Sequence, residues 1–188
     1  PENHSAEEAV RATPLPPVPA RGFLLGASTE SALLAASLDW HFVFAAHLNG
    51  DPELLREVVT AWRQHSVREV IVAVQVIVAP TQAEADALAQ KVEVWGVELV
   101  NGQRVTVASE EQAYAFARQA GSDPVRIARR AQSLLAGTAD SVLEQLNALH
   151  QQWGIDEFII DTPVADGATR VQSLRLLAEA RFNREVTV

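Results

Sequence analysis

Small and hydroxyl-bearing residues follow the first apolar run, in the segment Gly26-Ala27-Ser28-Thr29-Glu30-Ser31. A buried strand ending in such a turn delivers the chain onto a helix N-terminus. The unpaired N–H groups and the positive end of the helix dipole there suit a phosphate. The alternative is that Ser28 or Thr29 only caps the helix. The segment has neither the glycine fingerprint of a nucleotide-binding fold nor a phosphate loop ending in Lys-Ser/Thr. It is therefore a candidate phosphate site.

A histidine, His47, ends the second apolar run, after Ala45-Ala46. This position puts an imidazole at the edge where α/β sheets place their ligands. The small side chains of Ala45 and Ala46 leave room beside it for a flat ring, or they are ordinary core residues. The alternative for His47 is a hydrogen bond to a loop carbonyl. His47 is thus a candidate ligand-binding residue.

Two further polar residues interrupt or end apolar runs. Gln75 lies inside the most apolar run, where a buried amide needs partners, so it faces either a polar cavity or a ligand ring. Asp161 ends the last run, and an ion pair from Asp161 to Arg170 that holds the following loop is the favoured interpretation. The other histidines lack the spacing of metal ligands, so no metal site is predicted. No catalytic acid, base or nucleophile stands out.

The composition is that of one globular domain, with 188 residues, 48% hydrophobic and 21% charged. With 24 Asp and Glu against 15 Lys and Arg, the net charge of −9 disfavours nucleic acid and anionic membrane surfaces as partners. Apolar runs are too short to span a membrane and no signal peptide is evident, so we expect a cytoplasmic protein. The absence of cysteine excludes disulfides and thiolate metal sites. A chain that starts at Pro1 and holds no methionine is expected to be a processed or incomplete piece.

Apolar runs alternate with helical patterns along the chain, which predicts an α/β fold with a parallel sheet. Strands are expected at residues 22–27, 42–47, 70–79 and 158–161. Helix starts are expected at Ser28 or Thr29, Asp51-Pro52, Thr81 to Glu84, Ser109, Asp123-Pro124 and Gly137-Thr138, with a last helix over 169–182.

Two segments fall outside this alternation. Residues 1–21 are rich in proline and read as an extended lead-in to a domain over 22–188. The stretch between Ala83 and Thr138 is too long for one crossover helix. It predicts a helix to about Val94, a break at Asn101-Gly102 and then two short helices. An insertion over about 96–137 is therefore expected between the third and fourth strands.

Five short motifs in register resemble the luciferase-like flavin-dependent monooxygenases, the (β/α)8 TIM-barrel family that includes bacterial luciferase. They are GFLLGASTESA at 22–32, FAAH at 44–47, VIVAPTQAEA at 76–85, GT at 137–138, and DEFII at 156–160 with Arg170, Ser173, Leu177, Ala178 and Glu179. The resemblance implies that the chain is the C-terminal half of such a barrel, covering strands five to eight. The family's insertion between strands seven and eight then matches the insertion expected here.

The resemblance also implies a bacterial enzyme, a cofactor and a site. Reduced FMN, supplied by a separate NAD(P)H-dependent reductase, would react with O2 and oxygenate a small organic substrate. The deazaflavin F420 is the alternative cofactor. Carried over by residue, the flavin phosphate falls on the backbone N–H groups of Ala27 and Ser28 and the hydroxyls of Ser28 and Ser31. His47 lies near the flavin ring, and both Ala27 and Ala46 stand where many relatives have serine.

Other functions and partners stay open. The alternative function is that of a non-catalytic flavin-binding protein, which would keep Ser28 and Ser31 but show no turnover with reduced FMN and O2. A half-barrel fragment that needs a partner chain is a further alternative, because half a barrel exposes two strand edges and an apolar inner surface. A homodimer or a partner chain completing the barrel is accordingly expected.

Overall fold

The computed structural model describes residues 17, 18, 20–48, 50–129 and 133–186. The lead-in predicted over 1–21 therefore lies outside the described residues, except for 17, 18, 20 and 21. In the described part, no helix combines the length and the apolar character that crossing a membrane requires.

Four parallel strands form the main sheet, in the order β1, β2, β3, β8. They are β1 (Phe23–Gly26), β2 (His41–Ala45), β3 (Ile71–Val78) and β8 (Glu157–Asp161), each inside or overlapping a run predicted to be a strand. The predicted α/β class with a parallel sheet is confirmed. Because consecutive parallel strands are joined by helical crossovers, their carboxyl ends lie at one edge, which includes the turns after Gly26 and Ala45.

A short fifth strand, β7 (Leu134–Gly137), joins the sheet through β3 alone. Ile71 of β3 pairs with both β2 and β8, whereas Gln75 pairs with both β7 and β8. Strands β2 and β7 therefore share one edge of β3, and β8 occupies the other. Strand β7 extends the sheet beyond the carboxyl end of β2.

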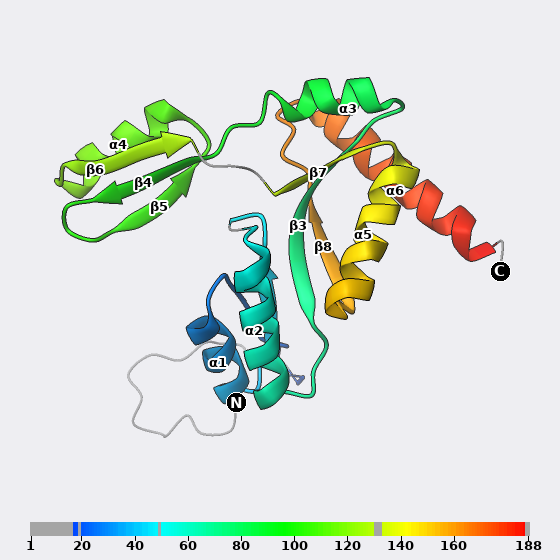
Figure 1. Ribbon diagram of the computed structural model, residues 1–188, viewed down its shortest axis with the longest axis horizontal. Coiled ribbons are helices and arrows are strands. Elements are labelled where there is room, and N and C mark those ends of the chain that lie inside the picture. Colours follow the sequence, from blue (N-terminus) through cyan, green and yellow to red (C-terminus); the bar gives the residue numbers. More distant parts are fainter. Residues whose placement is uncertain (1–16, 19, 49, 130–132, 187–188) are drawn as a thin grey trace.

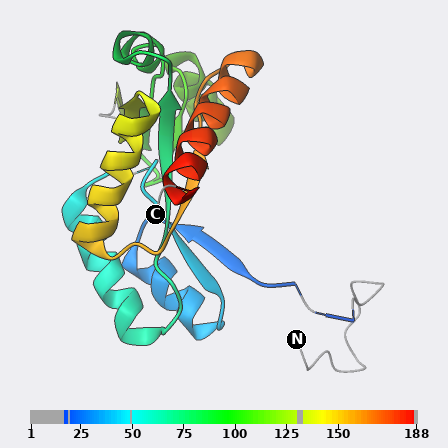
Figure 2. The same ribbon diagram turned by 90° about the vertical axis from the view of Figure 1, so that its right-hand side faces the viewer.

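Helices cover one face of the sheet (Figures 1 and 2). They are α1 (Thr29–Ser37), α2 (Pro52–His65), α5 (Ala139–Trp153) and α6 (Gly167–Val186), while α3 (Gln82–Ala89) packs against β3 and β7. Side chains alternate between the faces of a strand, so Val72, Val74 and Val76 of β3 face the helices and are almost fully buried. Trp62 of α2, 2% exposed, is among the largest side chains in this core.

The opposite face of the sheet is apolar but carries no helix among the described elements. Its centre is a small buried cluster of Val43, Ile71 and Ala73. Toward the two sheet edges the same face becomes exposed, with Leu25 of β1 at 57% and Ile159 of β8 at 44%. We call this surface the bare face. A sheet whose second apolar face is buried at its centre but exposed at its margins has the form of an open barrel wall.

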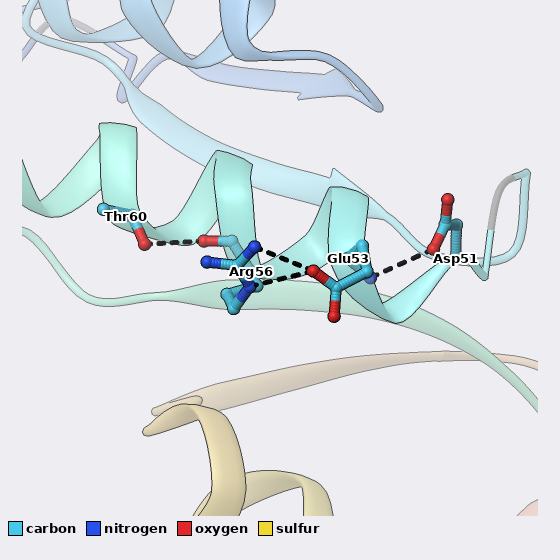
Figure 3. Close-up of polar contacts among 4 residues, drawn as sticks. All are labelled: Asp51, Glu53, Arg56 and Thr60. Atoms are coloured by element: carbon cyan, nitrogen blue, oxygen red, sulfur yellow. Dashed lines mark hydrogen bonds and ion pairs between the residues drawn. The ribbon is translucent and has the colours of Figure 1, made fainter.

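Most helix starts follow the predicted caps. Ser28, Asp51, Thr81, Ser109 and Thr138 all cap helices through their side chains, and Thr81 forms the expected capping box with Glu84. At α2, Asp51 Oδ1 accepts the Glu53 N–H at 3.0 Å, and Glu53 pairs with Arg56 at 2.7 Å (Figure 3). In the next turn the Thr60 hydroxyl donates to the Arg56 carbonyl at 2.7 Å (Figure 3). Because each start is capped, α1 and α2 begin directly after the strand-end loops.

The insertion is a second, antiparallel sheet, and the prediction of mainly helical structure there is wrong. Strands β4 (Trp95–Leu99), β5 (Arg104–Val107) and β6 (Pro124–Arg129) lie in the order β5, β4, β6, with α4 (Glu110–Ala120) packed on them. Figure 1 shows this unit to the left of the main sheet, on the side of α3. It has its own small core, which includes Val97, Leu99 and Ala113.

Two local signals explain the error. The predicted long helix ends at Ala89 instead of near Val94, and Asn101-Gly102 is a hairpin turn in which Gly102 adopts a φ of 85°. This left-handed conformation costs glycine little. Asp123-Pro124 starts strand β6 and not a helix, since proline is accepted at the first residue of an edge strand. Among the residues of the insertion that the structure describes, the helix predicted from Ser109 is the only helix.

Candidate functional site

The first candidate site is the turn between β1 and α1. Ser28 is the N-cap of α1, and its Oγ accepts the Ser31 N–H at 3.2 Å. The Oγ atoms of Ser28 and Ser31 also lie 3.2 Å apart. Both hydroxyls therefore gather at the first turn of the helix, where backbone N–H groups lack intrahelical acceptors. Ser28 therefore caps the helix, as one alternative predicted, and its hydroxyl also lies beside that of Ser31 at the helix N-terminus.

Gly26 makes room for this arrangement. A Cβ atom at position 26 would lie 2.5 Å from Ser31 Cβ and 2.6 Å from Ser31 Oγ. Real Cβ atoms do not approach other atoms so closely, so any larger residue would displace Ser31. The turn is thus a cradle whose shape depends on glycine, and its hydroxyls, backbone donors and helix dipole fit a phosphate group.

An acidic residue already occupies part of this turn. Hydrogen bonds from the backbone N–H of Glu30 itself and from the Ser28 hydroxyl lower the pKa of the Glu30 carboxyl group. Its negative charge is therefore held at the N-terminus of α1, where the dipole stabilises it. A phosphate entering the turn would meet this carboxylate and compete with it for the Ser28 hydroxyl.

The other predicted site residues point in different directions. Ala27 packs against the helix-side core, so only its backbone is available to the turn. Ala46 also packs against that core, and it lines a cavity of about 260 Å³ between the sheet and helices α2 and α5. His47 instead lines a second cleft at the carboxyl ends of the strands. The structure thus separates Ala46 from His47, although they are neighbours in sequence.

This second cleft, of about 460 Å³, lies where the insertion meets the main sheet. Three segments contribute to its walls: residues 91–94, residues 106–108 at the end of β5, and the loop over 162–165. The other lining residues are His47, Leu48, Gln75 and Arg170. The Nδ1 atom of His47 and the Oγ1 atom of Thr162 are buried and have no hydrogen-bond partner within the described part of the chain. We call this the strand-end cleft.

Gln75 and Arg170 have partners that differ in part from those expected. The Gln75 amide lines the strand-end cleft, as one of its two interpretations predicted, and donates to Asp161 Oδ2 at 3.0 Å. The predicted ion pair between Asp161 and Arg170 is wrong. The Arg170 guanidinium donates instead to the carbonyls of Val164 and Ala165, at 3.0 and 3.2 Å. The loop after β8 is therefore held through its backbone.

Sequence reasoning missed Lys91 and Glu93 of the cleft. Both lay within the helix predicted to continue to Val94, where they read as surface charges. One signal in the sequence could have drawn attention to Lys91: it is the one lysine in the 188 residues. Over the described residues, no group of three His, Asp or Glu side chains is arranged to hold a metal ion.

Similarity to a characterised enzyme covers most of the chain. The chain is 37% identical over 162 residues to the N-acetyl-S-alkylcysteine monooxygenase of Bacillus subtilis (strain 168). The aligned region covers 84% of this chain and 48% of that protein. No protein-family model matches the chain. The chain spans about half the length of the curated relatives it matches.

Solved structures share the arrangement of helices and strands. The structure of apo-MsnO8 matches 93% of this chain and 54% of its own, with a TM-score of 0.64 and 22% identity. The oxygenating constituent of 3,6-diketocamphane monooxygenase from Pseudomonas putida, in complex with FMN, matches 82% and 45%, with a TM-score of 0.52 and 20% identity. The chain has the luciferase-like fold. The resemblance to luciferase-like flavin monooxygenases, predicted from five motifs, is confirmed.

Luciferase-like structures with different cofactors match the chain. Besides the FMN complex, an F420-dependent secondary alcohol dehydrogenase, in complex with an F420-acetone adduct, matches 85% of this chain and 48% of its own. Its TM-score is 0.52 and its identity 12%. Structures that match the chain thus include one with FMN and one with an F420 adduct.

Proposed function

We propose that the protein is a flavin-dependent monooxygenase that uses reduced FMN and O2 to oxygenate a small organic substrate. The observation that carries the proposal is the cradle at Gly26, with the Ser28 and Ser31 hydroxyls 3.2 Å apart at the start of α1. The named activity of the relative that is 37% identical supports the same reaction class. When bound, the flavin would supply the redox chemistry.

In this proposal the chain's residues bind and position the cofactor. The hydroxyls of Ser28 and Ser31 and the backbone N–H groups of Ala27 and Ser28 hold the phosphate. His47, whose buried Nδ1 lacks a partner among the described residues, lies near the ring. The strand-end cleft excludes water from the reacting part of the substrate. A separate reductase provides reduced FMN, and F420 is the alternative cofactor.

The proposal includes completion of the barrel. The four strands β1, β2, β3 and β8 are assigned to barrel strands five to eight, and the insertion to the segment between strands seven and eight. Both sheet edges and the bare face then pack against the other half of the barrel, provided by a partner chain or a second copy. The chain's span of about half of its relatives supports this assignment.

The phosphate cradle can be tested by removing its two hydroxyls. We expect the double variant Ser28→Ala, Ser31→Ala to weaken FMN binding by about 1.5 to 3 kcal/mol, because two charge-assisted hydrogen bonds are lost. Quenching of flavin fluorescence during titration measures the affinity. Ser37→Ala, at the exposed end of α1, is the matched control and should bind like the wild type.

Unchanged FMN affinity in the double variant would refute the phosphate assignment. Titrating F420 in parallel tells which cofactor the turn prefers. Formation of an oxygenated product from N-acetyl-S-benzylcysteine, a compound of the class named for the Bacillus relative, with reduced FMN and O2 and compared with a reaction without protein, then tests the reaction. Tight FMN binding without oxygenation of this or related thioethers would favour the non-catalytic flavin-binding alternative.

A further inference from the structure

The strand-end cleft has the size and walls of a small-molecule site. Its volume of about 460 Å³ lies in the range of pockets that hold organic ligands. Val92 and Val94 come from the segment between α3 and β4, and Val107 comes from β5 of the insertion. Pro163 and Val164 come from the loop after β8. A ligand in the cleft would thus have an apolar body held between the two sheets.

Two charged residues on the same wall of the cleft, Glu93 and Lys91, differ in whether they have partners. Glu93 lies on its wall, but Glu93 Oε2 accepts the Trp95 indole N–H at 3.0 Å and Oε1 lies 3.7 Å from Arg129. The charge of Glu93 is therefore already compensated. Lys91 lies on the same wall and makes no ion pair with any residue that the structure describes. Lys91 contributes a positive charge without a partner.

Arg170, the second positively charged residue of the cleft, forms hydrogen bonds within its own loop. Arg170 donates to the carbonyls of Val164 and Ala165, and it lies near enough to Asp166 to help lower the pKa of that carboxyl group. The guanidinium N–H groups of Arg170 are therefore engaged within its own loop, with the Asp166 carboxylate nearby. A ligand that neutralises the remaining charge, that of Lys91, needs a single negative charge.

The cleft also contains a buried hydroxyl group, that of Thr162, without a hydrogen-bond partner among the described residues. Thr162 is 7% exposed, lines the cleft, and its Oγ1 makes no hydrogen bond within the described residues. A buried hydroxyl without a partner costs stability, which a ligand oxygen or N–H group would recover. This polar atom is independent of the charge on Lys91.

From these contacts we propose that the strand-end cleft binds a small organic monocarboxylate, with Lys91 as the counter-ion of its carboxylate and Thr162 as a hydrogen-bond partner. The inference rests on the proposed function, since it names the substrate class of the same enzyme. It adds that the segment between α3 and β4, through Lys91, selects substrates by charge.

The test compares a carboxylate with its neutral analogue. Binding of N-acetyl-S-benzylcysteine and of its primary amide is measured by calorimetry in the wild-type protein and in Lys91→Gln. We expect the wild type to bind the acid about tenfold more tightly than the amide, and Lys91→Gln to lose that preference. Lys91→Arg should retain it. Arg118→Gln removes an exposed positive charge from α4 of the insertion, outside the cleft, and should behave as the wild type.

The unique lysine gives a second readout. A saturating concentration of the acid should slow the modification of Lys91 by an amine-reactive reagent, followed by peptide mass spectrometry, and the amide should not. Equal binding of acid and amide, or an unchanged preference in Lys91→Gln, would overturn the inference. Titration of FMN in the same proteins separates the two proposals. Failure of the wild type to bind FMN refutes the flavin site. Normal FMN binding without a preference of the wild type for the acid refutes the role of Lys91 alone.

Discussion

At Ser28, one hydroxyl serves two neighbours. Its oxygen accepts the Ser31 N–H, and its hydrogen supports the carboxylate of Glu30. A phosphate bound at this turn would need the same hydroxyl and would lie beside a negative charge. Glu30 therefore limits how tightly an anion binds there.

Replacing this charge should strengthen cofactor binding. We expect Glu30→Gln to bind FMN roughly twofold to fivefold more tightly, because a like charge at the helix N-terminus is removed. The same fluorescence titration measures it, at low and high salt, and the gain should shrink as salt screens the charge. Glu53→Gln, at the start of α2, is the control. Weaker binding in Glu30→Gln would mean that the carboxylate helps to form the cradle.

A second acidic residue should give a pH-dependent stability. Asp166 Oδ2 accepts from both the hydroxyl and the N–H of Thr169 at 2.7 Å, which lowers the pKa of its carboxyl group. The folded-state pKa is depressed, so the stabilisation is complete above the usual aspartate value of about 4 and is lost as pH falls through the lower value. We expect Asp166→Asn to lower the Tm by roughly 2 to 5 °C at pH 7.

The difference in Tm between Asp166→Asn and the wild type should narrow below about pH 4, as thermal unfolding followed by circular dichroism can measure. Asp123→Asn, near the start of β6, provides a comparison outside the helix caps. A Tm difference that does not change with pH would contradict the charge-based explanation.

Single residues were predictable where the partner is close in sequence. Ser28 and Thr81 lie next to the helices they cap, so spacing alone identifies their role. The partner of Gln75 is 86 positions away, and that of Arg170 is a backbone carbonyl, which every residue offers. Sequence patterns carry no signal that distinguishes such partners.

At the scale of elements, one buried hydroxyl joins α6 to the sheet. Ser173 is 1% exposed, and its Oγ accepts the backbone N–H of Val78 at 2.7 Å. Val78 is the last residue of β3, so this bond satisfies a backbone group where the strand ladder ends. It holds the middle of α6 against the end of β3, close to the site.

Ser173→Ala should leave that N–H group buried without a partner. We expect the free energy of unfolding to fall by about 1 to 3 kcal/mol, measured by urea denaturation. Ser37→Ala removes an exposed hydroxyl of a similar kind and should change stability little. A loss below about 0.5 kcal/mol in Ser173→Ala would show that another group takes over the bond.

The helices and strands of the main sheet could be predicted from the sequence because two independent patterns, an apolar run and a following helix cap, mark each strand. Each strand of the main sheet is an apolar run followed by a capped helix, as at Gly26 and Ser28. In the insertion the signals are weaker, since β4 follows directly on the helix predicted to about Val94, and only Val97 and Leu99 alternate as buried residues of a strand. Pairing with β5 and β6 decides the outcome, and this pairing is a tertiary effect.

At the scale of the whole molecule, the bare face is the main unsatisfied surface among the described elements. Leu25 is 57% exposed, and Phe23, which stacks on His41 at 4.5 Å, is 50% exposed. Together with the open edges of β1 and β8, they form an apolar surface that favours association. This is the physical basis for a partner that completes the barrel.

Charges on the bare face should prevent that association. We expect the 188-residue chain to elute as an assembly in size-exclusion chromatography with light scattering, and Phe23→Glu, Leu25→Glu to elute as a single chain. Phe182→Glu, on α6 and 65% exposed, lies on the helix side and should leave the assembly intact. A wild-type chain that stays a single copy, and binds no dye specific for apolar surfaces, would refute the assembly.

Strand β3 pairs along both of its edges, with β2 and β7 on one side and β8 on the other. Most of its backbone amides are therefore held in ladders, while helices bury one of its faces. In hydrogen–deuterium exchange, residues 71–78 should be protected until the whole main sheet opens. The insertion, with its separate core, should exchange earlier and independently. The wall of the strand-end cleft contributed by the insertion would then open and close without disturbing the strand that anchors the site.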